Sequence, residues 1–146
     1  MPQIIIHENG VFNLFSTVVD APIFNHGIKE ADLLVYLYEE GGRSRVEDFI
    51  RKRERIVENG SFMSGSVKEV VMLNCAGKNE ENIDYETFMS MFMTIPENYA
   101  SWDFPEKINE IITEYNEFNE RYGKGKAYCS PSGVSSAGSA GNSGEA

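Results

Sequence analysis

A chain of 146 residues that is 41% hydrophobic and 12% aromatic is long enough to bury a core and too apolar to be disordered throughout. It carries 23 Asp and Glu against 13 Lys and Arg, and the resulting net charge of −10 disfavours nucleic acid and favours basic surfaces. No apolar run approaches the roughly 18–20 residues of a membrane span, and the cysteines Cys75 and Cys129 show no disulfide or metal spacing, so we expect a cytoplasmic protein without a membrane partner.

The N-terminal segment QIIIHENGVFNLFSTVV predicts a β-hairpin. Apolar residues flank Asn9-Gly10, a pair that suits a two-residue turn with positive φ at both positions. We therefore expect strands at about 3–8 and 11–18. The segment 20–27, which contains Pro, Asn and Gly, is expected to be a loop.

Helical periodicity and capping signals run through most of the remaining sequence. Gly41-Gly42 separates the first two helices, and Ser66 with Glu69 forms a capping box at the start of a third. The VVML sequence of this third segment also fits a buried strand, because periodicity does not separate the two for so short a run. About five helices are expected, within residues 28–40, 44–58, 66–75, 82–95 and 103–122.

Together these elements predict an α+β fold that is mostly helical, with an N-terminal β-hairpin followed by about five helices and a flexible C-terminal tail. We expect a single compact domain over residues 1–123. Residues 124–146 are dominated by Gly, Ser and Ala without periodicity, which is typical of a flexible tail.

The stretch RSRVEDFIRKRERIVENG concentrates positive charge, since residues 43–55 hold six of the 13 basic residues. On a helical wheel the basic side chains share one outward face, with acidic residues interleaved at spacings that favour local ion pairs. Three interpretations stay open: a solvated helix face, a contact patch for an acidic partner or for the chain's own acidic half, and a nucleic-acid grip. The candidate basic patch is Arg45, Arg51, Lys52 and Arg55.

Arg53 differs from its basic neighbours, because the wheel places it in the middle of the apolar stripe. A buried guanidinium is costly unless it is paired. Arg53 is therefore expected either to extend past the edge of the core or to form a buried ion pair with a carboxylate.

Negative charge gathers in the other half of the chain, where residues 79–120 hold eleven acids and one base. The segment 89–104 adds a dense strip of Met and aromatic side chains, which are common both in cores and at adaptable interfaces. We expect Met91 and Met93 to face outward and Trp102 to anchor an interface. The predicted partner-binding residues are Glu106, Glu110, Glu114, Glu117, Met91, Met93 and Trp102.

The sequence contains no nucleophile motif, phosphate-binding loop or dinucleotide-binding loop, and His7 and His26 have no further ligands at metal spacing. We therefore predict no catalytic residues, no metal, no cofactor and no enzymatic activity.

These observations predict a small acidic protein-binding module whose partner has a basic surface; self-association into a homo-oligomer is a further expectation. One form is an inhibitor of phage or mobile-element origin that occupies a basic groove of its target. Another is an assembly chaperone, because the order of short hairpin, acidic helices and small-residue tail is similar to that of the tail assembly chaperones of long-tailed phages. The alternative is a DNA-binding transcriptional regulator with a helix-turn-helix built on residues 28–58, although nucleic acid is disfavoured by charge.

Overall fold

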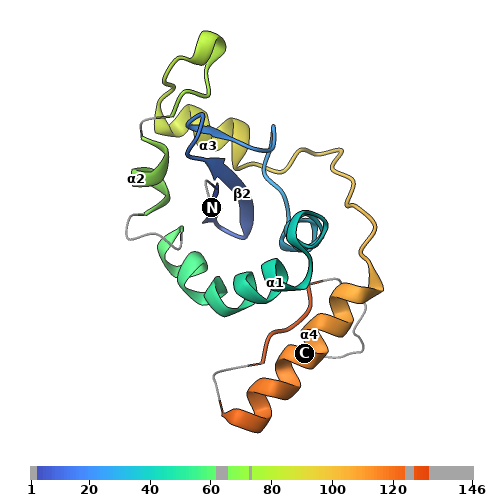
Figure 1. Ribbon diagram of the computed structural model, residues 1–146. Coiled ribbons are helices and arrows are strands. Elements are labelled where there is room, and N and C mark those ends of the chain that lie inside the picture. The colour runs from blue at the N-terminus through green and yellow to red at the C-terminus, as the bar shows by residue number, and fades with distance from the viewer. Residues whose placement is uncertain (1–2, 62–65, 73, 124–126, 132–146) are drawn as a thin grey trace. The chain divides into compact units, whose positions relative to one another are not determined.

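The computed structural model describes residues 3–61, 66–72, 74–123 and 127–131 (Figure 1). By its internal contacts the chain divides into two compact units. The first, here called the sheet unit, comprises Met1–Leu33 and Arg51–Ser101, and the second, the helical unit, comprises Leu34–Ile50 and Trp102–Ala146. The single domain over 1–123 stays a prediction, and most of the predicted tail at 124–146 lies outside the described residues.

The expected α+β class is confirmed, with antiparallel strands at the N-terminus and about half of the described residues in helices. The helices number four and not the five predicted, because the segments expected at 28–40 and 44–58 form one element, α1. The backbone of Gly42 within it is not helical (φ 68°, ψ −152°) and kinks the element at the predicted boundary. The elements in chain order are β1 (Gln3–Glu8), β2 (Val11–Ser16), β3 (Ala21–Pro22), α1 (Glu30–Asn59), α2 (Val67–Val71), a 3-10 turn (Lys78–Glu80), α3 (Tyr85–Phe92) and α4 (Glu106–Tyr122).

The predicted hairpin is present, with β1 and β2 antiparallel and in register from Gln3 opposite Ser16 to Glu8 opposite Val11. Asn9 and Gly10 both have positive φ, at 51° and 82°, as a two-residue turn of this kind requires. The short edge strand β3 pairs with the end of β2 inside the segment that the sequence assigned to a loop.

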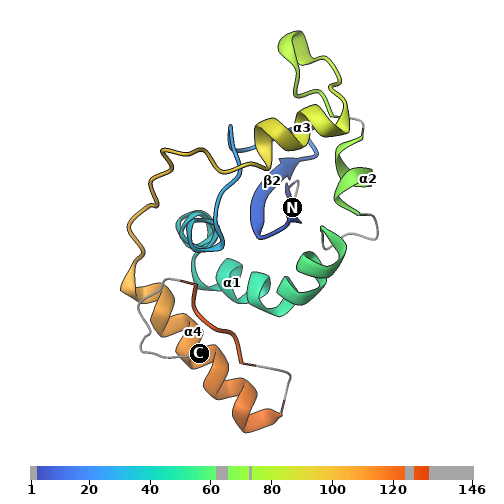
Figure 2. The ribbon, with the colours of Figure 1, turned by 180° about the vertical axis from the view of Figure 1, so that it is seen from behind.

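The sheet unit buries an apolar cluster between the hairpin and two helices. Phe15 of β2 and Phe88 of α3 approach with ring centroids 6.2 Å apart, and α2 lies against both β1 and α3 (Figures 1 and 2). The ambiguous third segment is a helix, because Ser66 and Glu69 form the predicted capping box. The buried members of this cluster are Ile6, Phe15, Val67, Val71, Phe88, Phe92 and Met93.

Two buried asparagines tie the loops of the sheet unit to its core. The amide nitrogen of Asn13 donates to the backbone carbonyls of Phe24, His26 and Phe92. Asn74 uses the same chemistry, donating to the carbonyl of Ile83 and accepting from its N–H. Buried backbone groups need such partners, so each asparagine satisfies a loop that has no regular ladder of its own.

In the helical unit, α4 follows the expected amphipathic pattern, with Ile108, Ile111 and Ile112 buried. The helix ends at Gly123, whose φ of 66° is the left-handed conformation expected of a C-terminal glycine. It begins at Glu106, later than the expected position 103, and its N-cap is Pro105, which makes no side-chain hydrogen bond.

Candidate partner-binding surface

The side of α4 opposite its buried isoleucines carries a row of carboxylates. At about 100° per residue, the five side chains span roughly 120° of the helix circumference. All five residues are exposed, and they define what we call the glutamate face: Glu106, Glu110, Glu114, Glu117 and Glu120. The structure therefore brings together the four glutamates that the sequence predicted, and it adds Glu120 to them.

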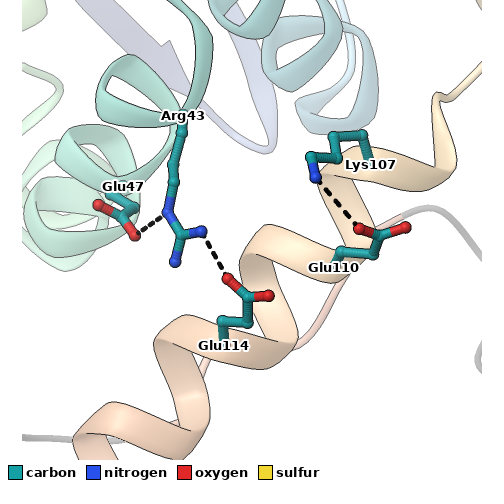
Figure 3. A network of polar contacts seen from close by, with 5 residues as sticks. All are labelled: Arg43, Glu47, Lys107, Glu110 and Glu114. Atoms are coloured by element: carbon teal, nitrogen blue, oxygen red, sulfur yellow. Dashed lines mark hydrogen bonds and ion pairs between the residues drawn. The ribbon is translucent and has the colours of Figure 1, made fainter.

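Arg43, near the bend of α1, contacts this face directly (Figure 3). Its Nη1 donates to Oε1 of Glu114, and its Nε donates to Oε2 of Glu47 at 2.8 Å. These two hydrogen bonds raise the pKa of Arg43 above its usual value. The side chains are about half exposed for Arg43 and Glu114, so solvent screens the pair and its contribution to stability is modest, about 0–1 kcal/mol.

Sequence reasoning did not include Arg43 in the basic patch or in any specific pair. The expectation that some of the basic stretch serves the chain's own acidic half is met by this residue, which lies 71 positions from Glu114. The one signal available was its position at the start of the basic stretch, beside the glycines at which α1 bends.

A second cation lies on α4 itself, where Lys107 donates to Glu110 at 3.4 Å (Figure 3). Both side chains are more than half exposed, so this pair between neighbouring turns adds only a few tenths of a kcal/mol. Among the described residues, ion pairs are thus recorded for Glu110 and Glu114, at the centre of the glutamate face.

An aromatic pair extends the surface at the C-terminal end of α4. The rings of Phe118 and Tyr122 lie 4.6 Å apart, and the two residues are 58% and 56% exposed. Exposed aromatic side chains of this kind are frequent anchors at protein interfaces. Trp102, in the same unit, is 45% exposed.

The other predicted partner-binding residues lie in the sheet unit. Met91 is exposed on α3. Met93 is buried in the core cluster, at 6% exposure, and does not face outward as expected. The reason is local: α3 ends at Phe92 and Met93 is its C-cap, with φ −121° and ψ 26°, so helical periodicity no longer sets its direction.

The candidate basic patch is divided between the two units, with Arg45 in the helical unit and Arg51, Lys52 and Arg55 in the sheet unit. Arg51 and Arg55 are exposed, while Arg45 and Lys52 are partly buried. α1 continues through Lys52 to Asn59 without the break that a separate recognition helix needs.

Arg53 forms an ion pair with a carboxylate, which was one of the two arrangements expected for it. Its Nε and Nη2 donate to the two carboxylate oxygens of Glu30 at 2.6 and 2.9 Å, a bidentate arrangement. The Glu30 side chain is only 14% exposed, so the pair joins the two halves of α1 at a largely buried position within the sheet unit.

His7 lies near this pair and has an altered pKa. Its Nε2 accepts a hydrogen bond from the N–H of Gly10 at 3.0 Å. Burial is the largest cause that lowers the pKa of His7, followed by the positive charge of Arg53, while Glu30 and Glu8 act in the opposite direction. The imidazole is a hydrogen-bond acceptor that supports the hairpin turn.

The described part of the chain contains no group of three or more His, Cys, Asp and Glu side chains placed to hold a metal ion. Within the same residues, none of the helices combines the length and the apolar character that crossing a membrane requires. No family model, curated protein or solved structure matches the chain.

Proposed function

We propose that this chain is a protein-binding module whose glutamate face contacts a basic surface of a partner protein. The observation that carries the proposal is the row of five exposed glutamates on α4, continued by the exposed rings of Phe118 and Tyr122. Charge attracts the partner and sets its orientation, while aromatic anchors contribute most of the binding free energy in such interfaces.

Two forms of this module follow from the same chemistry. As an inhibitor, the glutamate face occupies a basic groove of its target and excludes that target's own acidic ligand. As an assembly chaperone, it covers a basic and partly apolar surface until assembly. We propose a cytoplasmic protein of phage or mobile-element origin for both forms. The inhibitor form is supported by α4, which offers a rigid row of carboxylates to a basic groove.

The alternative of a DNA-binding regulator built on residues 28–58 receives no support from the geometry. Its recognition helix would need a turn near Lys52, where α1 is continuous, and its phosphate contacts would compete with the net charge of −10. It remains a prediction that the experiment below separates from the module.

The test compares charge reversal on the glutamate face with removal of the basic patch. The first variant is Glu106→Lys/Glu110→Lys/Glu117→Lys, and the matched control is Arg51→Ala/Lys52→Ala/Arg55→Ala. Glu114 is left unchanged so that its contact with Arg43 survives. Partners are captured from cell lysate with and without nuclease, and binding is then measured with the purified partner.

We expect the charge-reversed variant to lose at least about tenfold in affinity, and the basic-patch variant to bind as the unchanged protein does. Binding of the unchanged protein should also weaken as salt is added, because exposed charges are screened. Retention of binding by the charge-reversed variant would contradict the proposal. Nuclease-sensitive capture that depends on Arg51, Lys52 and Arg55 would favour the DNA-binding alternative.

A further inference from the structure

Two Asn-Gly pairs lie in the sheet unit, Asn9-Gly10 in the hairpin turn and Asn59-Gly60 at the end of α1. Asparagine loses ammonia most readily before glycine, because glycine has no side chain to hinder attack by its own backbone nitrogen. Both asparagines are exposed and line the same cavity, of about 370 Å³, so water reaches both. The two pairs are therefore open to the same spontaneous modification, and the backbone around each glycine decides which of them reacts.

The reaction proceeds through a cyclic imide. The backbone nitrogen of the glycine gives up its proton and bonds to the asparagine Cγ, while the Cγ–Nδ2 bond breaks and ammonia leaves with a proton. Water then adds to either carbonyl of the imide and opens the ring, giving aspartate or isoaspartate. The attack needs a glycine nitrogen that is released from its hydrogen bond and a backbone that can rotate toward the side chain.

The pair at the end of α1 is constrained at each of these points. Gly60 is buried, and its N–H donates to the carbonyl of Ile56 at 2.8 Å. The carbonyl of Gly60 accepts from the backbone N–H of His7 at 2.9 Å. A Cβ placed on Gly60 would lie 2.7 Å from the backbone nitrogen of Val67, which shows how closely the two backbones pack. Rotation of this glycine would break both hydrogen bonds, so we expect Asn59 to stay intact in the folded chain.

The glycine of the hairpin turn lies in open space. Gly10 is exposed, and a Cβ placed on it would meet no atom within 4 Å outside its chain neighbours. Its N–H donates to Nε2 of His7 at 3.0 Å. A backbone amide is far too weak an acid for a neutral imidazole to deprotonate, so this hydrogen bond restrains the nitrogen and does not activate it. Release of Gly10 thus breaks a hydrogen bond to a side chain at the surface, whereas release of Gly60 disrupts buried backbone contacts.

The imidazole of His7 accepts this hydrogen bond only while its Nε2 carries no proton. Burial is the largest cause that lowers the pKa of His7, followed by the charge of Arg53, while Glu30 and Glu8 act in the opposite direction. The ring is therefore neutral at and above neutral pH, where the base-promoted loss of ammonia is fastest. The restraint on Gly10 is present under the conditions in which it matters.

We propose that Asn9 is the deamidation site of the folded chain and that the hydrogen bond from Gly10 to His7 limits its rate. This inference is independent of the glutamate face and of the proposed function. Its consequence is structural, because isoaspartate adds a backbone carbon to the turn that fixes the register of β1 and β2. Either product also places a new negative charge beside Glu8.

The test follows both asparagines in one molecule. The full-length protein is kept at mildly alkaline pH, either folded in buffer or unfolded in guanidinium chloride, and is sampled over time. After digestion, chromatography with tandem mass spectrometry separates the peptides that carry asparagine, aspartate and isoaspartate. The variant is His7→Phe, which removes the acceptor and keeps an aromatic ring beside Phe12, whose centroid lies 4.7 Å from that of His7. Asn59 of the same chain is the matched control.

We expect similar rates at the two sites in the unfolded chain, and a faster reaction at Asn9 than at Asn59 in the folded chain. His7→Phe should raise the folded-state rate at Asn9 about threefold to tenfold, which corresponds to the net loss of one hydrogen bond, and should leave Asn59 unchanged. The order of the two sites is measured on the unchanged protein, so the proposal stays testable even where His7→Phe folds poorly.

Three results would overturn the inference. A faster reaction at Asn59 than at Asn9 in the folded chain would show that Gly60 is the less constrained glycine. An unchanged rate at Asn9 in folded His7→Phe would show that the hydrogen bond does not limit the reaction. A slower rate at Asn9 in this variant would show that the imidazole promotes the attack as a base.

Discussion

The sheet unit and the helical unit use polar side chains in opposite ways. In the sheet unit the connecting amides, Asn13 and Asn74, are buried, and each satisfies several backbone groups of loops. In the helical unit the ion pair of Arg43 and the glutamates of α4 lie at the surface. The first arrangement fixes a conformation, and the second leaves charge available to another molecule.

The contrast extends to aromatic side chains. Phe88 of the sheet unit is fully buried among the core residues, whereas Phe118 of the helical unit is mostly exposed beside Tyr122. An exposed pair of large rings contributes little to folding and is costly to keep in water. This difference leads us to expect a stabilising role for Phe88 and a partner-binding role for Phe118.

The largest expected effect is on the free energy of unfolding, when one phenylalanine of each unit is replaced by alanine. Phe88→Ala removes a buried ring from the core and should lower the free energy of unfolding by about 3–5 kcal/mol. Phe118→Ala removes an exposed ring and should change it by less than about 1 kcal/mol. Urea unfolding followed by circular dichroism measures both values.

Binding should show the reverse order. Phe118→Ala should weaken capture of the basic partner, because an anchoring ring at the end of the glutamate face is lost. Equal destabilisation by the two substitutions would break the comparison, since it would mean that Phe118 belongs to a core after all.

The next largest effect on stability compares two arginines of α1, one in each unit. Arg53→Ala leaves the largely buried carboxylate of Glu30 without its bidentate partner and should cost roughly 1–3 kcal/mol. Arg43→Ala breaks contacts between half-exposed groups and should cost at most about 1 kcal/mol.

Urea midpoints at low and high salt measure this difference. The effect of Arg43→Ala should shrink as salt is added, because screening already weakens its contacts. Arg53→Met keeps the packing of the apolar stem and separates it from the loss of charge. If Arg43→Ala costs more than Arg53→Ala, the assignment of stability to the buried pair is wrong.

Local rules predicted the elements whose causes lie within a few residues. Asn9-Gly10 fixed the hairpin and its register, and apolar spacing predicted α4 and both halves of α1. β3 was missed because two residues paired to an edge carry no alternation of their own. The helix count was off by one because the two segments meet directly at Gly42, whose non-helical backbone kinks α1 at the predicted boundary.

The site was predictable in its charges and not in its contacts. Helical spacing placed the glutamates together. The wheel placed Arg53 in the apolar stripe and left open whether it extends past the core edge or pairs with a carboxylate. It did not identify Glu30 or the pairing of Arg43 with Glu114, because these contacts join residues 23 and 71 positions apart. The two hydrogen bonds between Asn116 and the backbone of Tyr128 also join α4 to a segment whose composition indicated only a tail.

The smallest effect that we expect is a dependence of stability on pH in the sheet unit. His7 is buried and has a lowered pKa in the folded state, with burial as the main cause and Arg53 as the second. Below its unfolded value of about 6.5, the unfolded chain takes up a proton on His7 that the folded chain does not. Stability should therefore fall as the pH drops from about 6.5 towards the lowered folded-state value, and should not depend on His7 above that window.

Urea unfolding at several pH values between about 8 and 5 measures the slope of the free energy of unfolding against pH. His7→Gln removes the titrating group and should flatten the curve in this window, although its stability at high pH will be lower because the hydrogen bond from Gly10 is altered. Arg53→Ala should reduce the slope without removing it, since it takes away only one of the causes that lower the pKa. An unchanged slope in His7→Gln would place the titrating group elsewhere in the chain.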